Sequence, residues 1–405
     1  MTATPALPPA SDSSAAQSLR VALVFATAIA VVNGFGRFAY ALLLPVMRDD
    51  LRWDYALAGW LNTANSVGYG AGALAGLWLL SRYRPATLFV AGLALTVVTL
   101  LLCGFTRDVV LMMLWRFITG VGSAWVFACG GALIATNYAA HPAKASAAIA
   151  IYYAGGGLGI AGSGALLLPV LAHEWSWSTG WLVLAAAALA LSLWPAKLAW
   201  NIGGQSSALN NEHFQWSRFK GILFAYFLFG VGYIVYLTFV IAWLRDMRYA
   251  PTTSVGVWLV VGAASMASGI VWRRAMTRWW PASTFAAATL CTAAGSVLPL
   301  ASNHLSVLLV SAVLVGGSFF MVPAAMLALA RNTLPAAQWA KAMNLFTFIF
   351  ALGQAVGPVA AGWIADAYGL NAAMVAGAAV LLLSAGLALL QGRARFGTAT
   401  ARGAF

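Results

Sequence analysis

The sequence contains very little charge. Only 8% of its 405 residues are Asp, Glu, Lys or Arg, and nine of these are acidic. Hydrophobic residues make up 62%, more than the usual share of about 45–50% in soluble domains. They fall in blocks of about twenty, the length that a helix needs to cross a bilayer, and the short alternating strands of a β-barrel are missing. The composition excludes a soluble protein and predicts an all-α membrane protein.

Groups that carry most enzyme chemistry are missing from the apolar blocks. The three cysteines lie singly in predicted spans without a CxxC pair, so neither a disulfide nor a metal site is indicated. The nine acids and four histidines fall in tails, loops or helix ends, which leaves no catalytic pair at membrane depth. No G-x-x-x-x-G-K-[ST] phosphate loop occurs. We therefore expect neither an enzyme nor an ATP-driven pump, and no cofactor and no metal.

Basic residues outnumber acidic ones, 22 to nine, and the formal net charge is +13. They stand at the ends of apolar blocks and form no dense run with interleaved aromatics, so we expect no nucleic acid partner. Residues 1–19 are rich in Ala, Ser and Pro but lack the basic start and cleavage site of a signal peptide. We expect this segment to be a disordered cytoplasmic tail.

Loop signals divide the rest into twelve predicted spans, which a polar linker at 201–218 separates six and six; a second tail follows at 392–405. With the N-terminus inside, fifteen loop Lys and Arg fall on the cytoplasmic side and five on the other. This bias predicts that both termini are cytoplasmic in a bacterial inner membrane. The predicted spans are 20–44, 55–80, 86–105, 109–137, 147–172, 181–199, 219–243, 254–272, 281–301, 306–330, 341–365 and 371–391.

The two halves of the sequence repeat each other. Three short stretches recur in order at offsets of 195 to 197 residues: "GFGRFAY" at 34–40 with "GVGYIVY" at 230–236, Gly122-Ser123 with Gly317-Ser318, and "AKA" at 143–145 with 340–342. Agreement of three matches at nearly one offset indicates a duplicated six-helix unit.

Several motifs resemble those of the major facilitator superfamily. "RFITGVG" at 116–122 resembles the RxxxGxG motif of its fourth helix, and "GQAVGPVAAGWIADAYG" at 353–369 resembles its eleventh. "GFGRFAYALLLPVM" in the first span is similar to the opening of the YbfB/YjiJ-type branch. The resemblance covers about residues 20–391. It implies two pseudo-symmetric six-helix bundles, 20–200 and 219–391, that rock around a central site.

Two motifs of that superfamily are altered here. The loop "GALAGLWLLSRYR" at 72–84 keeps its glycines and two arginines but lacks the usual Asp, and "GGGLGIAGSG" at 155–164 lacks the Gly-Pro pair of the antiporter motif. Antiport is therefore not indicated. The resemblance implies a conformational role, alongside simple close packing of helices, for Gly72, Gly76, Arg82, Arg84, Gly120, Gly122, Gly353, Gly357 and Pro358.

Two arginines, Arg37 and Arg116, lie inside predicted spans. An arginine at the bilayer centre costs at least about 2.5–3.5 kcal/mol, and its guanidinium does not lose its proton to escape. On a helical period, Asn33, Arg37 and Tyr40 share a face. Arg37 is thus expected to line the central site, the alternative being a snorkel to the surface. Arg116 either binds substrate or holds backbone carbonyls.

Polar and aromatic faces of other spans complete the candidate site. They lie on spans two, four, seven and eleven, where amides also serve as links between helices and tyrosines as packing. The predicted substrate-binding residues are Asn33, Arg37, Tyr40, Asn62, Asn65, Tyr69, Arg116, Ser123, Tyr233, Tyr236, Asn344 and Gln354.

Two embedded cations without a nearby acid attract anions, and the planar guanidinium suits a carboxylate, sulfonate or phosphate. We hypothesise a secondary transporter that moves a small organic anion with an apolar or aromatic body by alternating access. The alternative is proton-coupled efflux of amphipathic drugs or metabolites, for which an embedded acid and the Gly-Pro pair are expected. We expect a monomer in the lipid bilayer. Coupling to a proton or a counter-anion, and import or export, stay open.

Overall fold

The computed structural model describes residues 12–138, 142–202, 216–302, 304–335 and 338–391. All regular structure in these ranges is helical. Most of the predicted linker and tails, at 1–11, 203–215 and 392–405, lies outside the described residues. The first helix begins at Asp12 rather than at residue 20, so part of the predicted N-terminal tail is helical.

Within the described ranges, twelve long helical segments cross the molecule, six in each half. The first half consists of α1 (Asp12–Ile29), η1 (Ala30–Phe38), α2 (Tyr40–Leu51), α3 (Tyr55–Leu80), α4 (Pro85–Phe105), α5 (Val109–Asn137), α6 (Pro142–Ala172) and α7 (Trp177–Ile202). The second consists of η2 (Trp216–Phe219), α8 (Lys220–Asp246), α9 (Pro251–Val271), α10 (Arg273–Arg278), α11 (Pro281–Ala301), α12 (Leu305–Phe319), α13 (Met321–Thr333), α14 (Trp339–Tyr368) and α15 (Leu370–Gln391).

Eleven of these segments are long and apolar enough to cross a membrane. The twelfth, α3, has the length, with 26 residues, but Asn62, Asn65 and Ser66 lower its hydropathy. All three of these polar side chains are buried inside the protein, where they avoid lipid. The prediction of twelve membrane-spanning helices is confirmed.

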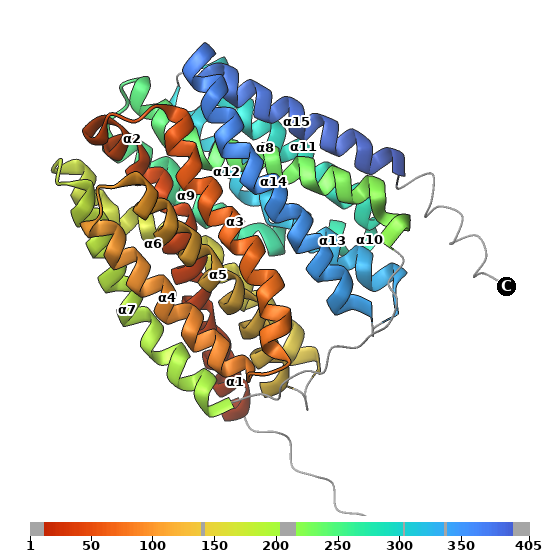
Figure 1. Ribbon diagram of the computed structural model, residues 1–405. Helices are drawn as coiled ribbons and strands as arrows, with labels where there is room; N and C mark the ends of the chain where they lie inside the picture. Colours follow the sequence, from red (N-terminus) through yellow and green to blue (C-terminus); the bar gives the residue numbers. More distant parts are fainter. Residues whose placement is uncertain (1–11, 139–141, 203–215, 303, 336–337, 392–405) are drawn as a thin grey trace, which may run out of the picture.

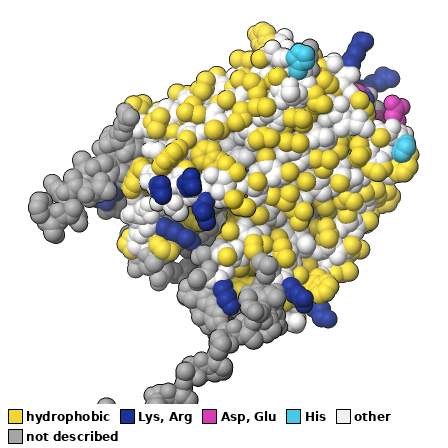
Figure 2. Space-filling view, turned by 180° about the vertical axis from the view of Figure 1, so that it is seen from behind, with side chains coloured by type: hydrophobic (Ala, Val, Ile, Leu, Met, Phe, Trp, Pro, Cys, Tyr) yellow, Lys and Arg dark blue, Asp and Glu magenta, His cyan; other side chains and the backbone are white. Residues whose placement is uncertain are grey.

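Each half is a six-helix bundle, and the two bundles meet along three helix pairs. α3 packs on α14, α6 on α9, and α2 on α8, and Figure 1 shows α3 and α14 running side by side along the middle of the molecule. Large apolar side chains such as Ile270 and Trp194 remain exposed on the outside. Figure 2 shows such side chains spread over the visible face between the two ends, as expected for contact with lipid.

The two ends of the molecule differ in charge. We call the end that holds Asp49, Asp50, Asp54, Asp246 and Asp366 the acidic end, and the opposite end the basic end. α1 begins and α15 ends at the basic end (Figure 1). Figure 2 shows Lys and Arg side chains gathered there, whereas the visible acidic side chain lies at the other end.

Two segments are interrupted near the middle of their length. The first changes from α-helix to the π-helix η1 and back, and the tenth breaks between α12 and α13 at Phe320. α14 continues without a break through Pro358. Both interruptions place irregular backbone inside the protein, where neighbouring helices can satisfy its polar groups.

Candidate functional site

Arg37 projects from the π-helix η1, all nine residues of which are buried. The wider turn is marked by the Ala39 N–H, which donates to the Gly34 carbonyl five residues earlier at 2.8 Å. Gly34 permits this segment to lie against α6, because a Cβ at this position would overlap the backbone of Gly159. A π-turn changes which side chains share a face and is often found at functional sites.

Arg116 holds η1 in place from α5. Its Nη1 donates to the Gly36 carbonyl at 2.5 Å and its Nη2 to the Arg37 carbonyl at 3.2 Å. The guanidinium lies over the rings of Tyr40 and Trp181, with its Cζ 5.2 and 5.7 Å from the ring centroids. It is fully buried within the first bundle. Of the two roles left open for Arg116, these contacts favour the structural one.

Two further predicted residues also support this region. Ser123 donates to the Val32 carbonyl at 3.2 Å and to the Thr119 carbonyl at 2.8 Å. Asn65 donates to the carbonyl of Arg116 itself at 3.1 Å. Their hydrogen bonds stay within the first bundle and hold its backbone.

Arg37, in contrast, reaches across to the second bundle. Its Nη2 donates to Oε1 of Gln354 on α14, and lies 3.4 Å from Oγ of Ser66 on α3. Its Cζ lies 5.0 Å from the centre of the Tyr69 ring. Arg37 is only 5% exposed, and its Nε finds no hydrogen-bond partner among the described residues. It is therefore a buried cation held by neutral groups with donor capacity left over.

Gln354 joins the two residues that occupy matching positions in the repeat. Arg37 and Tyr233 stand at the same place in "GFGRFAY" and "GVGYIVY". The amide accepts from Arg37 through Oε1 and donates to the Tyr233 hydroxyl through Nε2. The Gln354 side chain is fully buried. The predicted residues Arg37, Tyr69, Tyr233 and Gln354 thus come together between the bundles.

Aromatic rings surround this group on the second bundle. Phe350 stacks on Tyr226 with centroids 4.7 Å apart and planes at 4°, and lies 5.5 Å from Tyr233 at 18°. Tyr233 also stacks on Phe229 at 4.9 Å. Phe350 is half-buried. These parallel rings form a flat apolar wall beside the Gln354 amide.

Further polar links between the bundles lie on the acidic-end side of Arg37. Asn62 donates to Oγ1 of Thr238 at 2.7 Å, and Thr63 donates to the Ala355 carbonyl at 2.6 Å. Trp258 donates to Oγ of Ser163 at 3.1 Å. Together they close the interface from Arg37 toward the acidic end.

Charged groups complete this closure at the acidic end, in a network that we call the latch: Arg48, Asp49, Tyr55, Arg245, Asp246 and Asp366. Asp49 pairs with Arg48 at 3.0 Å and with Arg245 of the other bundle at 2.8 Å. Tyr55 donates to Asp246 at 2.6 Å. The Asp366 carboxylate accepts from the backbone N–H groups of Tyr55 and Ala56 at 2.8 and 2.9 Å. The latch thus ties the first turn of α3 to α8 and α14.

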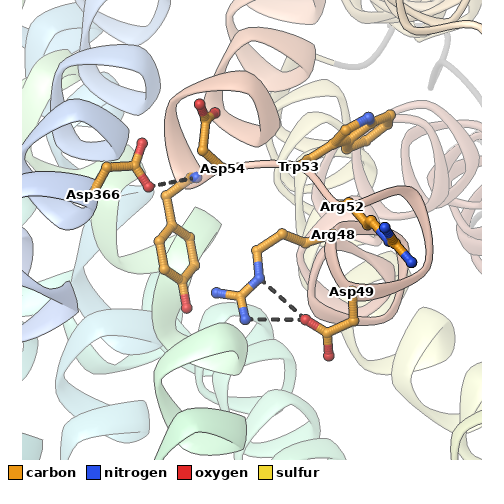
Figure 3. Close-up of a pocket in the computed structure, with 7 residues that line it drawn as sticks. Arg48, Asp49, Arg52, Trp53, Asp54 and Asp366 are labelled. Carbon is orange, nitrogen blue, oxygen red and sulfur yellow. Dashed lines mark hydrogen bonds and ion pairs between the residues drawn. The ribbon is translucent and has the colours of Figure 1, made fainter.

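The latch borders a cavity of about 360 Å³ (Figure 3). Its lining includes Asp49, Asp54 and Asp366 together with Arg48 and Arg52. Asp54 accepts from the Leu57 N–H as the N-cap of α3, and the other two carboxylates are held as described. All three acids of the lining thus take part in contacts that hold the acidic end together.

Small residues permit the bundles to approach closely. A Cβ on Gly59 of α3 would meet the Pro358 carbonyl of α14, and one on Gly362 would lie 2.5 Å from the Tyr55 carbonyl. Within a bundle, a Cβ on Gly120 would overlap the Asn65 carbonyl, and one on Gly353 would overlap that of Phe227. At these glycines, both between the bundles and within each bundle, the helices pack so closely that there is no space for a methyl group.

Other predicted residues lie apart from Arg37. Tyr40 donates to the Ala58 carbonyl at 2.8 Å inside the first bundle, and Tyr236 shares a hydrogen bond of 2.8 Å with Ser311 inside the second. Asn344 stands ten positions before Gln354 on α14, or roughly 15 Å along the helix toward the basic end. Asn33 is buried, and its Oδ1 has no partner in the described part of the chain.

The structure also places the remaining residues of the motifs for which a conformational role is predicted. A Cβ on Gly72 would lie 2.7 Å from Val121, one on Gly122 would lie 2.6 Å from the Gly92 carbonyl, and one on Gly357 would lie 2.5 Å from Ile234. The Arg82 guanidinium lies 4.2 Å from the Trp78 ring. Gly76 faces Trp125, and Arg84 is the N-cap residue of α4. Whether any of them moves during transport stays a prediction.

Sequence reasoning left several contacting groups out of the candidate list. Ser66 lies within hydrogen-bond distance of Arg37, and Phe350 stacks beside Tyr233. Thr238 accepts a hydrogen bond from Asn62. Ser66 lies on the polar face of the second span, which also carries Asn62, Asn65 and Tyr69, and that spacing is a usable signal. Thr238 and Phe350 stand in apolar runs with no such signal.

The sequence and the fold were compared with those of known proteins. The family described as "Uncharacterised MFS-type transporter YbfB" matches residues 29–389. The chain belongs to the YbfB family of major facilitator superfamily transporters. An uncharacterised MFS-type transporter, YceJ of Bacillus subtilis (strain 168), is 28% identical over 380 residues, which cover 91% of this chain and 89% of YceJ.

Solved structures agree on the fold. A mutant of the nucleoside transporter NupG superimposes with a TM-score of 0.71 at 13% identity, over 93% of this chain and 99% of NupG. The human organic anion transporter MFSD10 gives 0.64 at 15% identity, over 94% of this chain and 100% of its own. This member of the YbfB family is therefore a transporter, not an enzyme, with a small-molecule substrate and a bilayer around it.

Proposed function

We propose that this transporter moves an organic anion by alternating access and that Arg37 is the group that binds the anion. The observation that carries the proposal is the state of Arg37 itself: a buried cation between the bundles, held by the Gln354 amide and the Ser66 hydroxyl. The four ion pairs of the described residues all lie at the acidic end, away from Arg37.

The energetic argument concerns desolvation. A guanidinium taken out of water keeps a large penalty unless a negative charge compensates it, and hydrogen bonds to neutral acceptors return only part of it. An anionic substrate supplies the missing charge. Its binding is then favoured where it matters for transport, at the interface between the two moving parts.

Arg116 is not part of the proposed binding group. Both of its Nη atoms already donate to backbone carbonyls inside the first bundle. Moving it toward a substrate would break two buried hydrogen bonds made by a charged donor, at about 1.5–3 kcal/mol each. The anion is therefore received by one cation, not by two.

Orientation follows from the charge bias of the loops. We place the acidic end outside and the basic end in the cytoplasm of a bacterial membrane, because cytoplasmic loops are enriched in Lys and Arg. The interbundle hydrogen bonds given above for the described residues, and the latch, lie between Arg37 and the acidic end. The structure then corresponds to a carrier closed toward the outside.

Fold similarity does not choose the substrate, since the neighbours with the same fold include a nucleoside transporter and an organic anion transporter. The choice of an anion depends on Arg37. Efflux of amphipathic drugs driven by protons is the alternative; its proton would have to act on the latch carboxylates Asp49, Asp246 and Asp366, which join the bundles.

A thermal-shift screen of organic anions on the purified protein tests the proposal. We expect a subset of anions to raise the melting temperature of the wild-type chain and to lose this effect in Arg37→Gln. Arg278→Gln, which removes an exposed arginine on α10, is the matched control and keeps the effect. Equal stabilisation of wild type and Arg37→Gln by every anion that acts would show that Arg37 is not the ligand.

A further inference from the structure

The Gln354 amide stands where a carboxylate would stand. Arginine presents a planar fork that matches two oxygens of one carboxylate. In this structure a single oxygen of the second bundle, Gln354 Oε1, accepts a hydrogen bond from Arg37 Nη2. Arg37 Nε, on the adjacent edge of the fork, finds no acceptor among the described residues. The amide fills half of a site built for an anion.

The charge around this position sets the valence of the anion. Arg37 is the embedded cation that reaches the second bundle. Arg116 keeps its own charge, but its Nη atoms donate to the carbonyls of Gly36 and Arg37 inside the first bundle. A monovalent anion neutralises Arg37. A divalent anion would bring a second negative charge that Arg37 cannot pair and that the Nη atoms of Arg116 do not reach, and burying a charge without a direct partner is unfavourable. The geometry therefore selects against phosphate esters and dicarboxylates.

The surroundings set the shape of the rest of the ligand. Tyr69 of the first bundle lies face-on to the guanidinium at 5.0 Å, and Phe350 and Tyr233 of the second form part of the parallel ring stack. Aromatic rings favour offset stacking on other flat rings. A planar apolar body attached to the carboxylate fits such walls better than a bulky or polar one.

We propose that the substrate is a monovalent aromatic carboxylate, and that Gln354 holds its place in the empty carrier. On binding, the carboxylate takes over Arg37 from Gln354 Oε1, and the freed amide can donate from Nε2 to the bound anion. This inference rests on the proposed function, because it names the substrate class of the Arg37 site. It makes Gln354 a competitor as well as a neighbour of the substrate.

Benzoate binding to the purified full-length protein, measured by calorimetry, tests the inference with two substitutions of opposite sign. Gln354→Glu places a resident carboxylate on Arg37 and is expected to weaken benzoate binding about tenfold or more, since charge-assisted hydrogen bonds are the stronger ones. Gln354→Ala removes the competing acceptor and is expected to tighten binding about fivefold. Gln391→Glu, the same chemical change at the basic end of α15, is the matched control and keeps wild-type affinity.

Ligand chemistry gives the second arm of the test. Phthalate, a dianion, and benzyl alcohol, a neutral analogue, are expected to bind at least about tenfold more weakly than benzoate, because each leaves a buried charge uncompensated. Phthalate binding as tight as benzoate binding, or no benzoate binding to wild type, overturns the inference. So does unchanged affinity in both Gln354 variants.

The outcomes separate this inference from the proposed function. If Arg37→Gln loses anion binding but the Gln354 variants behave like wild type, the proposed function stands and the role of Gln354 is wrong. If Arg37→Gln binds benzoate like wild type, both fail. Gln354→Glu is nearly isosteric with the native residue, so it reports on the site even where Gln354→Ala loosens the packing.

Discussion

At the scale of single residues, the protein places two arginines in its interior for different purposes. Arg116 uses both Nη atoms on backbone carbonyls within its own bundle. Arg37 uses one Nη on an amide and a hydroxyl from two other helices, one of them in the other bundle. The first arrangement stabilises the backbone of η1, and the second leaves the Arg37 charge on neutral acceptors only.

Substitution of Arg116 should therefore affect folding rather than recognition. In Arg116→Gln, at least one of the Gly36 and Arg37 carbonyls loses its donor, at about 1–3 kcal/mol for a buried group. We expect a lower melting temperature than in Arg37→Gln, measured by thermal unfolding of both variants in the same detergent. An Arg116→Gln protein that is as stable as wild type but no longer binds anions would contradict this account.

The sequence predicted the central group better than its surroundings. Polar positions in apolar spans indicated Arg37, Tyr69, Tyr233 and Gln354, which the structure brings together. Tyr40 was assigned to the face of Arg37 on a 3.6-residue period, yet its hydroxyl bonds to Ala58 inside the bundle. The π-helix that contains Arg37 and ends just before Tyr40 changes that period, and no local sequence signal indicates such a turn.

At the scale of helices, the α3 and α14 pair controls the closed interface. Gly59 and Gly362 allow the two backbones to meet, and Asp366 caps the start of α3 from the other bundle. The sequence alone was enough to predict α3 and α14 as membrane-spanning helices. Their pairing was not, because it depends on contacts between residues some 300 positions apart in the chain.

A larger side chain at Gly362 should hold the bundles apart. Valine there would collide with the α3 backbone at Tyr55 and Ala56. In a background without Cys103, Cys129 and Cys291, we expect Gly362→Val to speed maleimide labelling of Thr238→Cys several-fold. Gly386→Val is the matched control, because a Cβ there meets nothing within 4 Å. Equal labelling rates in both variants would refute a closing role for this contact.

The latch contains strong and weak parts. The Arg48, Asp49 and Arg245 side chains are 22% to 47% exposed, and exposed pairs contribute about 0.2–1 kcal/mol. The Asp366 carboxylate, although exposed, accepts two hydrogen bonds from the N-terminus of α3, and a cap of this kind contributes about 0.5–2 kcal/mol. Asp366→Ala should therefore speed labelling of Thr238→Cys more than Arg48→Gln does. The reverse order would show that the ion pairs dominate.

At the scale of the whole molecule, the polar contacts given above between the bundles, within the described part of the chain, lie on one side of Arg37. Duplication, span count and the resemblance carried by the motifs were enough to predict two six-helix bundles, because apolar length and period specify spanning helices. Which end is closed depends on the sum of many interbundle contacts, and no sequence pattern reports that balance.

The two sides of Arg37 should differ in access to water. Asn344 is half-buried on the basic-end part of α14, and Thr238 is fully buried between the bundles on the acidic-end side. In the protein without native cysteines, we expect Asn344→Cys to react with a soluble maleimide at least about tenfold faster than Thr238→Cys, given the few-kcal/mol gaps typical of such two-state equilibria. Faster reaction at Thr238→Cys would place the opening at the acidic end instead.

The central claim is that a transported anion supplies the charge that Arg37 lacks. Exchange of a labelled anion, chosen as the strongest stabiliser of the wild-type chain, across proteoliposomes tests it most directly. We predict exchange by wild type and Arg278→Gln, and exchange at least about tenfold slower in Arg37→Gln, in line with the loss of a buried charge-assisted bond. Arg37→Gln that folds and exchanges the anion at the wild-type rate would contradict the account.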